Sequence, residues 1–110
     1  MIRSVTISPE AAADLIAARR WLLQPGSGQV ARRRLRNIRS SIRALKQAPC
    51  LWAIGDHPDI REIPVEGYRV LYMVEPDTGS SDTSGDVIVL RMFEPWQERT
   101  GYMHRMPLRR

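Results

Sequence analysis

The chain has 110 residues, of which 43% are hydrophobic and 26% charged, which is typical of a folded globular protein rather than a disordered one. A single cysteine, Cys50, excludes an internal disulfide, and without a Cys/His cluster at zinc spacing we expect neither metal nor cofactor. No apolar run reaches the ~20 residues of a membrane span and the N-terminus lacks a signal peptide's apolar block, so we expect a cytoplasmic protein. A net charge of +5 favours acidic or phosphate-rich partners.

The N-terminal part of the sequence predicts a strand and then a helix. Residues 2–7 alternate β-branched with polar side chains, as in a half-buried strand. Ser8 and Pro9 predict a helix start, because Ser caps free amides and Pro is tolerated in the first turn. Helical spacing selects the apolar positions of the expected buried stripe, which are Ala12, Leu15, Ile16, Leu22 and Leu23.

A second helix is predicted over residues 29–47, after the break at residues 24–28. Its apolar stripe follows alternating four- and three-residue steps: Ala31, Leu35, Ile38, Ile42 and Leu45. Its cations are Arg32, Arg33, Arg34, Arg36, Arg39, Arg43 and Lys46. Two interpretations stay open for them. Arg32, Arg36, Arg39 and Arg43 are candidates for binding nucleic acid or an acidic protein, and the alternative is a solvated helix face.

The stretch over residues 60–75 predicts a β-hairpin, reached through a connecting loop at residues 48–59 in which Trp52 and Ile54 pack on the core. The turn is Glu66-Gly67, because a glycine accepts the positive φ that a tight turn needs. Strand alternation then places the two members of each facing pair on one face of the sheet. The pairs on the mostly apolar face are Val65 with Tyr68, Ile63 with Val70 and Arg61 with Tyr72. The other face carries Glu62, Pro64, Arg69, Leu71 and Met73.

After a predicted mobile loop at residues 76–86, residues 87–93 have the apolar character of a central strand buried on both faces. Two helices cover only one face of a small sheet, so we expect a partner protein to cover the other. Candidate contacts for a partner are Arg61, Leu71, Phe93 and Trp96. We expect residues 1–110 to form a single domain, with a flexible tail from about residue 95.

These motifs, taken in this order, resemble the RelE/ParE superfamily of bacterial type II toxins, of the plasmid stabilisation type. The resemblance runs from about Ser4 to Tyr102. The segments that carry it are the alanines with Asp14-Leu15 in the first helix, Ile42 with Leu45 and Pro49, REIPVEGYRVLY at 61–72 and VIVLRMF at 87–93. It implies an α+β fold, in which an N-terminal strand and a helical hairpin pack on one face of a small, mainly antiparallel sheet. It also implies a cognate antitoxin that neutralises the toxin.

The resemblance leaves the target open. ParE-like members resemble DNA gyrase inhibitors that act by binding, and this is the function that we favour. RelE-like members are similar to ribosome-dependent mRNA endoribonucleases, and their pattern points to Arg69 by motif and to Arg91 and Tyr102 approximately. Such cleavage needs a proton acceptor, a donor and cations for the phosphorane. The histidine that related toxins often have near Glu94 is missing here. A third hypothesis is a non-toxic, basic nucleic-acid-binding module.

Overall fold

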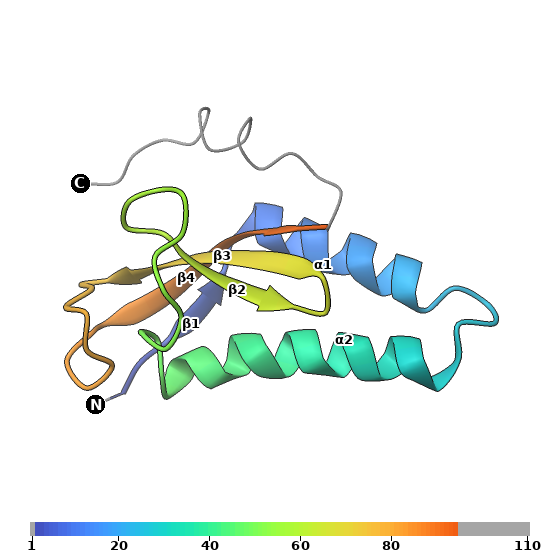
Figure 1. The fold of residues 1–110 in the computed structure, drawn as a ribbon, viewed down its shortest axis with the longest axis horizontal. Coiled ribbons are helices and arrows are strands. Elements are labelled where there is room, and N and C mark those ends of the chain that lie inside the picture. The colour runs from blue at the N-terminus through green and yellow to red at the C-terminus, as the bar shows by residue number, and fades with distance from the viewer. Residues whose placement is uncertain (1, 95–110) are drawn as a thin grey trace.

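The computed structural model describes residues 2–94, which form one mixed sheet and two long helices (Figure 1). In chain order the elements are β1 (Val5–Ile7), α1 (Pro9–Leu22), α2 (Gly28–Arg43), a 3₁₀ turn η1 (Ala44–Lys46), β2 (Arg61–Val65), β3 (Tyr68–Glu75) and β4 (Asp86–Phe93). The predicted order of elements is confirmed. Within the described range, neither helix has the length and apolarity needed to cross a membrane.

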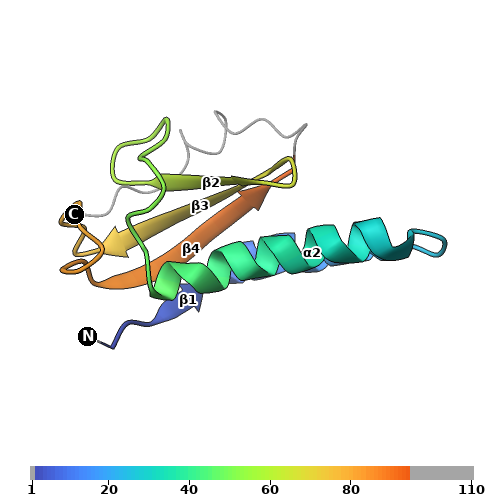
Figure 2. The same cartoon turned by 60° about the horizontal axis from the view of Figure 1, so that its bottom comes forward.

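The sheet has the strand order β1-β4-β3-β2, so β4 and β3 lie at its centre. β1 runs parallel to β4, and the other neighbouring strands pair antiparallel. Both helices join the sheet in one hydrophobic core, and they lie together along one side of it (Figures 1 and 2). The predicted α+β fold, with a helical hairpin on one face of a mainly antiparallel sheet, is therefore confirmed.

The hairpin of β2 and β3 has the predicted register. Glu66 and Gly67 form the two-residue turn with φ angles of 53° and 82°, the positive values of a type I′ hairpin turn. Val65 then pairs with Tyr68 and Arg61 with Tyr72. A two-residue turn leaves the strands no alternative pairing without moving their apolar face into water, which is why the sequence predicts this register.

Helix α1 buries a different stripe from the one that the sequence predicts. Ser8 caps it as expected, because its Oγ accepts a hydrogen bond from the Ala11 N–H at 3.0 Å. Ile16, however, is 53% exposed. The stripe that faces the core consists of Ala11, Leu15, Ala18 and Leu22. Small alanines let the helix lie close to the sheet, so the larger Ile16 and Leu23 point away from it.

Helix α2 buries the predicted stripe. Leu35, Ile38, Ile42 and Leu45 are all nearly inaccessible to solvent, and Ala31 packs against the same cluster. Because the 4/3 spacing leaves only one apolar side to this helix, its orientation on the sheet is fixed. Every other position of α2 is polar or exposed.

The second face of the sheet has a small core of its own. Leu71 and Phe93 cluster with Ile60, which ends the loop before β2, and Leu90 packs against them. Leu71 is 0% and Phe93 2% exposed, so these two side chains do not form the bare apolar surface that the sequence predicts. The loop supplies part of the cover that we assigned to a partner. The predicted tail, from about residue 95, lies outside the described residues.

The loop between β3 and β4 is held in place by one buried arginine. We expected residues 76–86 to be mobile, yet Arg3 donates from its guanidinium to the carbonyls of Ser81, Ser84 and Gly85 at 2.6 to 2.8 Å. The same group donates to the carbonyl of Lys46 at the end of η1. Since Arg3 is only 6% exposed, this network ties the loop and η1 to the segment just before β1.

Candidate functional site

A row of cations follows the length of α2. Its members, which we call the α2 basic row, are Arg32, Arg36, Arg39, Arg43 and Lys46, and all five are exposed. They repeat the 4/3 spacing of the buried stripe, shifted by one residue, so they share one side of the helix. From Arg32 to Arg43 the row spans roughly 17 Å at ~1.5 Å per residue.

No carboxylate neutralises the α2 basic row within the described part of the chain. The one cation of α2 with an acidic partner is Arg34, which lies outside the row and meets Glu66 of the hairpin turn at 3.4 Å. Asn37 donates to the same carboxylate at 2.7 Å. In the row, Arg43 donates to the Ser40 hydroxyl at 3.3 Å. The positive potential of this side of α2 is therefore available to an acidic partner.

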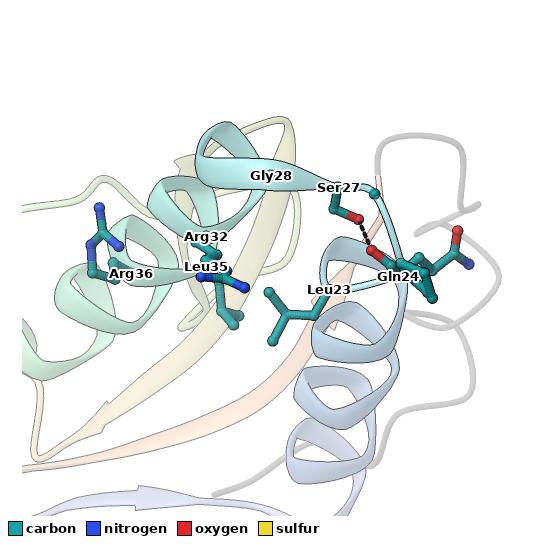
Figure 3. A pocket seen from close by; sticks show the side chains of 9 residues that line it. Leu23, Gln24, Ser27, Gly28, Arg32, Leu35 and Arg36 are labelled. Carbon is teal, nitrogen blue, oxygen red and sulfur yellow. Dashed lines mark hydrogen bonds between the residues drawn. The ribbon is translucent and has the colours of Figure 1, made fainter.

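Two grooves flank the row. One, of about 550 Å³, lies at the helix–helix turn, where Leu23 and Leu35 lie between the helices and Arg32 and Arg36 stand along its side (Figure 3). The other, of about 510 Å³, lies at the far end of α2 beside β1 and is lined by Ile42 and Arg43 among others. Apolar walls beside cations suit an amphipathic acidic segment better than a bare phosphate backbone.

By the strand register, Arg69 and Arg91 occupy positions on the second face of the sheet, and the Arg91 side chain reaches Asp14 of α1. Arg69 pairs across the strands with Phe93 and Leu71 with Arg91, so all four positions share this face. Arg69 is exposed, and its side chain makes no hydrogen bond or ion pair with another described residue.

Arg91 is engaged within the chain. Its guanidinium meets the Asp14 carboxylate through two nitrogens, with Nε and Nη2 at 2.7 and 3.1 Å from the two oxygens. The Met92 N–H donates to the same carboxylate at 2.8 Å, and the guanidinium carbon lies 4.9 Å from the centre of the Phe93 ring. Asp14 thereby joins α1 to β4, a role that the sequence does not predict.

Arg61 also has an internal role. It is 7% exposed, and its Nε and Nη2 donate to the two carboxylate oxygens of Asp77 at 2.9 and 3.0 Å. Its Nη1 donates to the Trp52 carbonyl. The hydrogen bond that Arg61 donates to Asp77 raises the pKa of Arg61, and the guanidinium in turn lowers the pKa of Asp77. Arg61 therefore joins β2 to two loops, and its guanidinium is not presented to a partner.

The remaining predicted residues fall into two groups. Leu71 and Phe93 are buried as described above, while Trp96 and Tyr102 lie outside the described residues. The described range also holds no group of three or more His, Cys, Asp or Glu side chains placed to bind a metal ion. The sequence-predicted candidates thus separate into an exposed row on α2, an exposed Arg69 and two arginines paired inside the chain.

Comparison with known proteins adds a family to this geometry. The family described as the ParE toxin of the type II toxin-antitoxin system, parDE, matches residues 5–93. The chain belongs to the ParE toxin family. This ParE-type toxin also resembles a chain of a solved structure titled "Chromosomal ParDE TA system from P. aeruginosa", with a TM-score of 0.63 and 18% sequence identity over 84% of this chain and 96% of that one. At that identity the likeness shows the fold. Among curated proteins, none matches this chain in sequence. Family membership implies a cognate antitoxin as partner.

Proposed function

We propose that this ParE-type toxin inhibits DNA gyrase in the cytoplasm by binding it, without a hydrolytic step. The observation that carries the proposal is the state of Arg91. Nuclease chemistry would use this cation on the phosphorane, but its guanidinium is already held by Asp14 at 2.7 and 3.1 Å. A row of exposed cations lies on α2, on the opposite side of the sheet from Arg69. A surface of that kind can bind a macromolecule electrostatically.

We further propose that the cognate antitoxin neutralises the toxin through an acidic, amphipathic segment. Carboxylates on such a segment complement the α2 basic row, which has no acidic partner of its own among the described residues. Apolar side chains on the same segment would fill the grooves beside Leu23, Leu35 and Ile42. The complex would then bury cations and apolar area together, as protein interfaces usually do.

One observation favours a second candidate, a RelE-like ribosome-dependent endoribonuclease. Arg69 is exposed on the second face and has no internal partner among the described residues, so it could contact an RNA phosphate. In that case Arg69 would be the principal cation of the reaction, and the ribosome would supply part of the site.

Induced expression in bacteria tests these functions against each other. Wild type and Arg69→Ala should both cause DNA breaks and filamentous growth, since Arg69→Ala leaves α2 unchanged. Arg33→Ala, on the exposed side of α2 away from the row, is the matched control. If wild type instead cleaves mRNA during translation and Arg69→Ala does not, the endoribonuclease function would be supported and gyrase inhibition contradicted. Expression without any growth defect would favour the non-toxic binding module.

A further inference from the structure

The two outer strands of the sheet differ in what their free edges present. On β2, the backbone groups of Glu62 and Pro64 point outward, because the alternate residues Arg61, Ile63 and Val65 make the hydrogen bonds to β3. The Glu62 N–H is bonded to the Ala53 carbonyl at 3.3 Å, and Pro64 has no N–H to offer. The β2 edge therefore has no free donor for another strand.

Residues 90–93 of β4 extend past the end of β1, and the backbone groups along this part of the β4 edge are also occupied. There the chain of β1 has turned into α1, and two side chains from that part of the chain take up the backbone groups of β4. The Ser8 hydroxyl donates to the Leu90 carbonyl at 2.9 Å, and the Asp14 carboxylate accepts from the Met92 N–H. Of the sheet edges in the described residues, the outer edge of β1 is therefore the one without such bonds to its N–H groups.

No strand of residues 2–94 pairs with the outer edge of β1. The Val87 N–H donates to the Ser4 carbonyl and the Ser8 N–H to the Val89 carbonyl, which fixes the parallel pattern. In that pattern both backbone groups of Thr6 point to β4, and those of Val5 and Ile7 point away from the sheet. None of the described residues bonds to the outward N–H groups of Val5 and Ile7.

A groove lies directly beside this edge. It has a volume of about 510 Å³, with apolar walls from Val5, Ile7 and Ile42 and cations from Arg43 and Lys46. Figure 2 shows β1 next to the C-terminal end of α2, so a strand added to β1 would run along that end. Alternate side chains of such a strand would enter the groove, and carboxylates among them would meet the two cations.

We propose that β1 is a strand-addition site for an extended, acidic segment of a partner protein. If the proposed function holds, that segment belongs to the antitoxin. Backbone hydrogen bonds to Val5 and Ile7 would hold the segment, and Ile42 with Arg43 and Lys46 would select for alternating apolar and acidic side chains. A second copy of this chain fits less well, because symmetric pairing of two β1 edges would bring two sets of these cations together.

Amide hydrogen exchange measured by NMR tests the site directly. In the free chain the amides of Val5 and Ile7 should exchange fast and that of Thr6 slowly. A short synthetic peptide that alternates valine with glutamate should slow exchange at Val5 and Ile7 by about tenfold or more. The matched control is the same peptide with lysine in place of glutamate, which should bind at least about tenfold more weakly.

Two variants separate the backbone and charge contributions. Val5→Pro removes an outward N–H without removing a bond to β4, and it should weaken peptide binding by about tenfold, whereas Val5→Thr keeps the N–H and should bind like wild type. If Val5→Pro fails to fold, the charge variant still decides. Arg43→Glu with Lys46→Glu should also weaken binding by about tenfold, while Arg33→Glu on the same helix should leave it unchanged within about twofold.

Several results would overturn the proposal. These are no peptide binding, binding without protection of Val5 and Ile7, protection already present in the free chain, or a concentration-dependent dimer that protects both amides. None of these measurements depends on toxicity. If the peptide protects Val5 and Ile7 but the chain leaves gyrase active, the proposed function alone is contradicted. If the chain inhibits gyrase but the peptide does not protect these amides, the strand-addition site alone is contradicted.

Discussion

The arginines of α2 and the arginines of the sheet differ in their surroundings. Along α2, Arg36 and Arg39 are exposed and have no acidic partner in the described part of the chain. In the sheet, Arg61 and Arg91 each meet a carboxylate through two nitrogens, at 2.7 to 3.1 Å. Because the acids Asp14 and Asp77 pair with arginines of the sheet, they do not offset the exposed cations of α2. Internal arginines should therefore control stability, and the α2 basic row should control binding.

The largest effect on stability is expected from Arg61→Ala. This change leaves the Asp77 carboxylate partly buried without its cation, and breaking such a pair costs about 3 kcal/mol of the free energy of unfolding. Urea unfolding of the purified protein measures the change. Arg36→Ala on α2 is the matched control and should stay within about 0.5 kcal/mol of wild type. Equal destabilisation in the two variants would remove the distinction between the two groups of arginines.

A smaller destabilisation is expected from Asp14→Ala. The substitution removes the acceptor of the Met92 N–H and of the Arg91 guanidinium, and hydrogen bonds to charged groups contribute about 2 kcal/mol. Glu10→Ala, also in α1 but exposed, serves as the control for removing negative charge near the helix start and should cost about 0.5 kcal/mol. Urea unfolding again compares the two. An effect of Asp14→Ala no greater than that of Glu10→Ala would show that the hydrogen bonds of Asp14 are not structural.

The dependence of stability on pH should show the same Arg61–Asp77 ion pair. Arg61 lowers the pKa of Asp77 below its ordinary 3.8, so the unfolded chain binds a proton more readily than the folded one. The stabilisation is therefore complete above that value and disappears as the pH falls through the lower, folded pKa. Unfolding measured at a series of acidic pH values should show a steeper decline in wild type than in Arg61→Gln. Parallel curves would contradict the contribution of the pair.

The smallest change in stability is expected on α2 itself. Arg36→Glu with Arg39→Glu should shift the free energy of unfolding by no more than about 0.5 kcal/mol, because both side chains are exposed. Binding should respond instead. If a nucleic acid is the partner, the salt dependence of its affinity should fall by about one unit for each phosphate that the variant no longer neutralises. An unchanged affinity for every acidic partner would show that the row is a solvated helix face.

Sequence patterns predict those parts of the fold that local rules determine. The turn at Glu66-Gly67 fixes the register of the hairpin, and the 4/3 spacing from Ala31 to Leu45 fixes the buried side of α2. The predicted stripe of the first helix is wrong at Ile16 and Leu23, which are exposed. In an alanine-rich helix the apolar contrast is weak, and close approach to the sheet favours small side chains over large ones.

The candidate site is harder to predict, because its decisive interactions join distant positions. Arg61 meets Asp77 across 16 positions, and Arg91 meets Asp14 across 77. A sequence shows these charges but does not show which pairs the fold brings together. The exposed row on α2 follows from helical periodicity alone, whereas the internal use of Arg61 and Arg91 does not.

The most direct test of the proposed function is DNA supercoiling by purified gyrase in the presence of this purified chain. We predict inhibition by wild type that is retained in Arg69→Ala and reduced in Arg36→Glu with Arg39→Glu. Full gyrase activity at every toxin concentration, together with ribosome-dependent cleavage of mRNA by the same preparation, would contradict the proposal.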